Sequence, residues 1–202
     1  MKIGVLGTGN VGRTIAAKLV ELDHDVLVGS RTAKEDAVTF ADAAAHGELV
    51  FNCTAGDTSL EALRMAEADN LKDKTLVDVA NPLDFSRGMP PILAVCNADS
   101  LGEETQRLFP RVKVVKALNT VTCKVMVDPS LVGGEHDVFI CGNDEGAKDE
   151  VRELVRAFGW PAEHIIDLGD ITGARGMEMY LPLWLRLMDV AGSATFNIKV
   201  AR

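Results

Sequence analysis

Three glycines near the start of the chain have the spacing of a phosphate-binding loop. Gly7, Gly9 and Gly12 form a G-x-G-x-x-G motif between an apolar segment, 2–6, and a helical pattern that ends near Asp23. The first glycine permits a tight turn, the second lets backbone amides approach a pyrophosphate, and the third lets the helix pack on the strand. The helix N-terminus adds a partial positive charge that favours phosphate. The motif predicts a dinucleotide site, and the alternative is a glycine turn in a similar domain that binds nothing. The residues of the predicted site are Gly7, Thr8, Gly9, Asn10, Val11 and Gly12.

The end of the second predicted strand, 25–29, indicates which dinucleotide is bound. Enzymes that use NAD carry an acidic residue near this position for the ribose 2′-hydroxyl, whereas this chain has Ser30 and Arg31. A guanidinium can form a charge-assisted pair with a 2′-phosphate, and a serine can donate a hydrogen bond to it. Lys34 is close enough to assist, although taken alone it is more typical of a solvated loop. The cofactor predicted here is NADP(H) rather than NAD(H).

Composition and charge narrow the class of protein. The chain has 202 residues, of which 47% are hydrophobic and 25% charged, and its net charge is −9. A single soluble domain is expected from the length, and the negative charge argues against nucleic acid as a partner. The four cysteines show no C-x-x-C spacing and are predicted to be buried and reduced. Because the first strand begins at once and the apolar stretch 179–190 is too short to span a bilayer, we expect a cytoplasmic protein with no membrane partner.

Apolar segments alternate with helical patterns along most of the chain, which is typical of an α/β protein. The predicted fold is a Rossmann-type, doubly wound and mainly parallel sheet in residues 1–171, with a short C-terminal helical extension, 172–202, in the same compact unit. Expected strands are 2–6, 25–29, 49–53, 75–79, 112–117, 137–141 and 164–168. Expected helices after the first are 33–45, 58–68, 100–109 and 144–158, the last three capped by Thr58, Ser100 and Asp144.

The C-terminal extension departs from this alternation. Residues 176–190 read as a helix that is apolar around most of its circumference, with Pro182 either kinking it or lying in its first turn. Such a helix needs burial on more than one side. We expect it to form a homodimer interface and also to border the substrate pocket through Met177. Residues 195–200 are expected to add an edge strand.

In a doubly wound sheet, ligands bind beyond the carboxyl ends of the strands. The residues predicted there are Thr54 and Ala55, then Ala80, Asn81, Pro82 and Leu83, then Asn119 and Thr120. The amides and the hydroxyl among them could bind a nicotinamide carboxamide or a substrate, or could serve equally well as turn and cap residues. The histidines lie in connections or before strands, so none stands out as a proton donor. Lys116 or Lys124 could serve as an acid, but each is expected to be a solvated lysine. Hydride exchange with a flavin-like ring, which needs mainly stacking geometry, fits this better than carbonyl chemistry.

Several segments resemble one known family. GTGNVG, VGSRT, VVKALNTV at 114–121, VFICGND at 138–144 and the closing tail resemble the NADPH-dependent reductases of the deazaflavin coenzyme F420. They are equally similar to the cytoplasmic oxidoreductase domain of the STEAP metalloreductases. The resemblance implies hydride transfer between NADPH and the deazaflavin in a homodimer. It implies that NADPH is held by Thr8, Asn10, Val11, Ser30 and Arg31, and that the hydride-transfer cleft is bordered by Asn81, Pro82, Asn119 and Cys123.

One departure from the deazaflavin enzymes bears on the acceptor. They typically carry a histidine where this chain has Asn119, and the STEAP-like domains have asparagine there, as this chain does. Three functions therefore stay open. The chain could be a reductase of coenzyme F420 or of FMN or FAD, a reductase of a small carbonyl or imine, or a non-catalytic NADP(H)-binding redox module with a protein partner.

Overall fold

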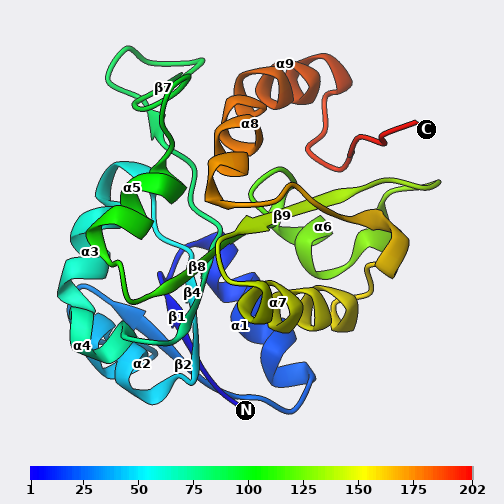
Figure 1. The fold of residues 1–202 in the computed structure, drawn as a ribbon. Helices are drawn as coiled ribbons and strands as arrows, with labels where there is room; N and C mark the ends of the chain where they lie inside the picture. The colour runs from blue at the N-terminus through cyan, green and yellow to red at the C-terminus, as the bar shows by residue number, and fades with distance from the viewer. Residues whose placement is uncertain (202) are drawn as a thin grey trace.

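A computed structural model describes residues 1–201, which are built around one eight-stranded sheet. The strand order is β10-β9-β8-β5-β4-β1-β2-β3. All neighbouring pairs are parallel except β8 and β9, which pair antiparallel. The predicted Rossmann-type, mainly parallel sheet is therefore confirmed (Figure 1). The strands are β1 Lys2–Leu6, β2 Asp25–Ser30, β3 Val38–Thr39, β4 Leu49–Asn52, β5 Thr75–Asp78, β8 Lys113–Ala117, β9 Val138–Gly142 and β10 Ile165–Asp167.

Helices cover both faces of the sheet because successive strand side chains point to opposite sides. In β1, Ile3 and Val5 join the core under one set of helices, whereas Leu6 joins the core on the opposite face. The first set is α1 Asn10–Glu21, α6 Cys123–Val127 and α7 Glu145–Ala157. The second set is α2 Phe40–His46, α3 Ser59–Met65, α4 Ala68–Leu71 and α8 Ala174–Met179. α5, Leu101–Leu108, lies against β8 and α8. The two layers are visible in Figure 1.

Two predicted helices are shorter in the structure than in the sequence reading. The segment expected to be helical at 33–45 forms a turn and β3 first, and α2 begins only after Thr39, whose hydroxyl accepts the amide of Asp42. The predicted cap at Thr58 is wrong, since its side chain makes no capping bond and the 3-10 turn Gly56–Thr58 precedes α3. The caps at Ser100 and Asp144 are confirmed, because each side chain accepts the amide three residues later.

The long connection 81–97 contains a hairpin that the sequence did not indicate. Its strands, β6 Leu83–Asp84 and β7 Ile92–Leu93, are two residues each and pair antiparallel. The prediction of four buried cysteines is also wrong in part. Cys53 and Cys141 are buried, but Cys123 is half-buried and Cys96, in this connection, is exposed.

The C-terminal segment forms two helices rather than one. α8 ends at Met179, and α9, Leu181–Ala191, follows it. Pro182 lies in the first turn of α9, which is one of the two positions predicted for it. The predicted edge strand at 195–200 is absent from the described chain. The tail instead joins the chain just before β9 through a backbone hydrogen bond from Asp137 N to Ile198 O (2.9 Å). Within residues 1–201 no helix is long and apolar enough to traverse a bilayer.

Candidate active site

The three glycines of the motif, which runs from the end of β1 into the first turn of α1, meet three different surroundings. Gly7 has a φ of 119°, which other residues rarely adopt. A Cβ on Gly12 would lie 2.0 Å from the carbonyl oxygen of Gly7, so the close packing of α1 on the loop requires glycine. A Cβ on Gly9 would meet no atom of the described chain within 4 Å. The motif is therefore closely packed against the chain at Gly7 and Gly12 but open at Gly9. Gly9 lies at the N-terminus of α1, which has no side-chain cap.

The tip of β2 is arranged differently from the prediction in one respect. Ser30 is buried, and its hydroxyl donates a short hydrogen bond to the carbonyl of Thr32, inside the turn. Its proton is thus committed within the chain rather than presented to a ligand. Arg31 and Lys34 lie exposed in the same turn.

Arg13 is a basic residue of this region that the sequence reading missed. Its Nε donates to the carbonyl of Thr8 (2.9 Å), and its guanidinium lies 2.6 Å from Asp36 in the turn after β2. The hydrogen bond and charge of Arg13 hold the pKa of Asp36 below its usual value. Arg13 directly follows the third glycine, and that position is the signal that could have identified it.

A cleft of about 250 Å³ opens beyond the carboxyl ends of β4 and β5. Six of the predicted site residues line it: Val11, Thr54, Ala55, Ala80, Asn81 and Leu83. The remaining lining residues are Cys53, Gly56, Asp57, Val79 and Phe85. Its two walls approach closely at Gly56, where a Cβ would lie 1.9 Å from the carbonyl oxygen of Asn81. The cleft begins at the glycine loop and ends at the hairpin.

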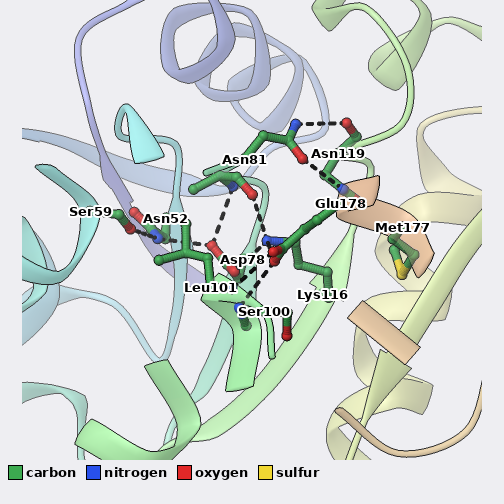
Figure 2. Close-up of polar contacts among 12 residues, drawn as sticks. Asn52, Ser59, Asp78, Asn81, Ser100, Leu101, Lys116, Asn119, Met177 and Glu178 are labelled. Atoms are coloured by element: carbon green, nitrogen blue, oxygen red, sulfur yellow. Dashed lines mark hydrogen bonds and ion pairs between the residues drawn. The ribbon is translucent and has the colours of Figure 1, made fainter. Parts of the chain in front are cut away.

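Asn81 and Asn119 join the ends of β5 and β8 through two hydrogen bonds. The side-chain Nδ2 of Asn81 donates to the backbone carbonyl of Asn119 (2.9 Å). In return, Nδ2 of Asn119 donates to the side-chain Oδ1 of Asn81 (2.9 Å) (Figure 2). Within residues 1–201, Oδ1 of Asn119 and Oγ1 of Thr120 are buried and have no hydrogen-bond partner. Buried polar atoms are nearly always paired in folded proteins. Both atoms lack partners but are covered by the chain, so a ligand that carries N–H donors would reach them only after a local rearrangement.

Lys116 is fully buried, which contradicts the prediction of a solvated lysine. Its Nζ lies 2.8 Å from Asp78 Oδ2 and 2.7 Å from Glu178 Oε1, and it donates to the carbonyl of Ala80 at 2.5 Å (Figure 2). Burial alone would lower the pKa of Lys116, but the two carboxylates raise it above its ordinary value. Burial raises the pKa of Glu178. Lys124, the other lysine considered, is exposed as expected.

The buried cluster continues toward the cleft through Asn52 at the end of β4. Its amide nitrogen donates to Asp78 Oδ1 (2.9 Å) and to Ser59 Oγ (2.7 Å), and its Oδ1 accepts the hydroxyl of Thr54 (2.7 Å). Sequence reasoning missed Asn52, Asp78 and Glu178. The signal that could have found the first two is a polar residue that closes an otherwise apolar strand.

Five residues predicted at the nicotinamide or acceptor lie outside the lining of the cleft: Pro82, Asn119, Thr120, Cys123 and Met177. Asn119 and Thr120 are each 2% exposed. Met177 is buried in the core, its Sδ 3.7 Å from Cys141 Sγ, and does not face the open cleft. Burial raises the pKa of the Cys141 thiol to about 12. Cys123 is half-buried and begins α6. Pro82 is buried, although its neighbours Asn81 and Leu83 both line the cleft.

Comparison with known proteins places this geometry in a family. Residues 2–82 match the model of the NADP oxidoreductases that depend on coenzyme F420. The crystal structure of a candidate F420-dependent NADP reductase from Arthrobacter sp. FB24 is 50% identical to the chain, covers 100% of both chains and superposes with a TM-score of 0.95. The chain belongs to the F420-dependent NADP oxidoreductase family. It is thus an NADP-dependent oxidoreductase with the Rossmann-type fold of that family.

Two curated relatives show how the family extends. The F420-dependent NADP reductase of Methanocaldococcus jannaschii is 28% identical over 210 residues, which cover 93% of this chain and 92% of the relative. The rat metalloreductase STEAP3 is 34% identical over 199 residues, which cover 91% of this chain but only 38% of the metalloreductase. The resemblance to both groups that the sequence motifs suggested is confirmed.

Proposed function

We propose that this family member transfers hydride between NADP(H) and a flavin or deazaflavin ring, with coenzyme F420 as the first candidate acceptor. The observation that carries the proposal is the character of the cleft. Its lining includes two titratable side chains, Asp57, which is exposed, and Cys53, whose pKa burial raises. A carbonyl or imine reductase needs a proton donor beside the hydride path, whereas transfer between two rings depends mainly on their stacking.

The residues of the chain have distinct roles in this proposal. The open loop at Gly9 and the uncapped start of α1 fit a pyrophosphate, and Arg31, assisted by Lys34, fits the 2′-phosphate. The unpaired Oδ1 of Asn119 and hydroxyl of Thr120, which the chain covers, would pair with the carboxamide of a nicotinamide after a local rearrangement beside Asn81. When bound, NADPH supplies the hydride from its nicotinamide ring. The acceptor would stack on the opposite side of the cleft, near Leu83.

The cofactor assignment is tested by replacing Arg31. The unmutated protein should bind NADPH at least about tenfold tighter than NADH, which corresponds to about 1.4 kcal/mol from one charge-assisted contact. Arg31→Ala should abolish most of that difference and leave NADH affinity nearly unchanged. Arg156→Ala, which removes an equal charge from α7, is the control and should keep the preference. Equal affinities of the unmutated protein for the two dinucleotides, by calorimetric titration, would refute the assignment.

The acceptor assignment is tested by NADPH oxidation. We expect turnover with coenzyme F420 or with FMN or FAD, and little with a panel of small carbonyls and imines. Turnover with a member of the panel alone would transfer the proposal to carbonyl or imine reduction. Tight NADPH binding with no turnover of any acceptor would indicate a non-catalytic redox module.

We also propose that the protein is a symmetric homodimer formed through α9. Leu183 and Val190 of α9 are 56% and 87% exposed, and Phe85 and Met89 of the connection with the hairpin are 56% and 70% exposed. Met89 lines a small pocket together with residues of α9, so the exposed apolar side chains of α9 and of the connection 81–97 are neighbours. A contiguous apolar surface of this kind is typical of an interaction site, and the two-fold dimer is the commonest closed assembly.

A further inference from the structure

Glu178 ties the C-terminal segment to the body of the sheet. Its carboxylate accepts the backbone amides of Leu101 (2.9 Å) and Gly102 (3.0 Å), the first two residues of α5, and contacts the ammonium of Lys116. Glu178 is 1% exposed. Its charge is thus balanced on one side by a helix N-terminus and on the other by a lysine. One side chain of α8 therefore meets both α5 and β8 (Figure 2).

Lys116 and Asp78 both form hydrogen bonds to the backbone of Ala80. Lys116 Nζ donates to the Ala80 carbonyl, and the Ala80 amide donates to Asp78 Oδ1 (3.3 Å). Strand pairing of β5 ends at Asp78, so these side chains provide hydrogen-bond partners just beyond the strand. Ala80 lines the cleft and precedes Asn81, whose side chain is fixed by Asn119. The floor of the cleft at Ala80 is thus built on the buried charges.

We propose that Lys116 and Glu178 are positioning residues for the nicotinamide end of the dinucleotide, because docking of α8 sets the conformation of the cleft floor through Glu178, Lys116 and Ala80. This inference rests on the proposed placement of the nicotinamide beside Asn119. Neither side chain lines the cleft, so both act through the backbone of Ala80.

A purely structural role does not account for this cluster. Buried ion pairs are often replaceable by apolar side chains without loss of stability, so burial of three charged groups is a poor means of holding two helices together. α8 already has a second tie to α5, in which Arg175 donates to both carboxylate oxygens of Glu103 at 2.6 and 2.8 Å. The Arg175 pair holds the same two helices but makes no contact with Lys116 or Ala80 among the bonds of the described chain. It therefore provides a matched control.

The experiment compares two ligands by fluorescence or calorimetric titration: NADPH, and 2′-phospho-ADP-ribose, which lacks the nicotinamide. Lys116→Met, which keeps the length of the side chain, should weaken NADPH binding about tenfold, the effect of losing about one net hydrogen bond. Glu178→Gln keeps an oxygen for the amides of α5 but loses the charge opposite Lys116. This variant should weaken NADPH binding about threefold. Both variants should bind 2′-phospho-ADP-ribose within about twofold of the unmutated protein, because its contacts lie at the glycine loop and Arg31.

Three results would overturn the inference. These are equal losses for both ligands, no loss for either ligand, or an equal selective loss in Arg175→Met, which we expect to bind both ligands normally. If Lys116→Met does not fold, Glu178→Gln decides the question, since it preserves the size of the side chain. Failure of the unmutated protein to bind either ligand would instead refute the proposed function.

Discussion

Replacement of Gly9 by valine should separate binding from folding. Gly9 has φ of −74° and ψ of −177°, an extended conformation that any residue adopts, and a Cβ there would meet no atom of the described chain within 4 Å. Loss of glycine flexibility in the unfolded chain stabilises by about 0.4–1 kcal/mol. Valine is the poorer residue at a helix N-cap, by about 1 kcal/mol. The two effects nearly cancel, and the melting temperature should stay close to that of the unmutated protein.

Binding should respond far more strongly. The branched side chain would occupy the open side of the loop and keep a pyrophosphate from the amides at the start of α1. Loss of about two hydrogen bonds to a charged group, at about 1.5–3 kcal/mol each, predicts at least a hundredfold weaker binding of both NADPH and NADH. Thermal melting by circular dichroism and titration of NADPH fluorescence measure the two quantities on the same sample.

Gly12→Ala is the contrasting variant. Its Cβ would lie 2.0 Å from the Gly7 carbonyl, so α1 must shift and the melting temperature should fall. A Gly9→Val protein that melts normally and still binds NADPH with unchanged affinity would show that the dinucleotide lies elsewhere.

Two further predictions concern assembly and pH. Leu183→Glu places a charge on the exposed face of α9 and should convert the proposed dimer to monomers. Light scattering at micromolar concentration measures this change, and the NADPH affinity should stay the same. A monomeric unmutated protein would refute the dimer. Hydrogen bonds from Arg175 lower the pKa of Glu103, so its stabilising contribution is present above its ordinary pKa of 4.5 and is lost as the pH falls through the lowered value. When the pH is lowered from about 5 to about 3, the melting temperature of Glu103→Gln should therefore fall less than that of the unmutated protein. Because burial raises the pKa of Glu178, Glu178→Gln should show the opposite sign, gaining stability relative to the unmutated protein as the pH rises above 4.5. Parallel pH curves for these variants and the unmutated protein would contradict both assignments.

The sequence predicted the parts of the site that depend on local rules. Glycine spacing, apolar strands and the capping residues Ser100 and Asp144 act over a few residues, so the loop, the sheet and two helix starts could be predicted. Thr58 satisfied the same capping pattern without capping, because the chain enters α3 through a 3-10 turn. A short pattern states which bonds are available and not which the chain will use.

The buried charges could not be predicted because each is explained only by residues distant in the sequence. Lys116 lies near the end of a strand, where a solvated lysine is common, and its burial is explained only by Asp78 and Glu178. Glu178 in turn lies on a helix that the sequence showed only as an apolar surface. Met177 was expected at the acceptor pocket for the same reason, but the turn of α8 that points Glu178 toward Lys116 points Met177 toward Cys141.

The tie between Glu178 and α5 also bears on how the protein is made. Leu101 and Glu178 are separated by 77 residues, and α8 leaves the ribosome after every strand of the sheet. The glycine loop and the strands that carry it can fold earlier, while Lys116 has only Asp78 as a carboxylate partner. Since contacts of long sequence range form late, a nascent chain would hold a nearly complete sheet whose cleft floor is still unset. Synthesis of α8 would thus complete a site whose other parts were translated before it.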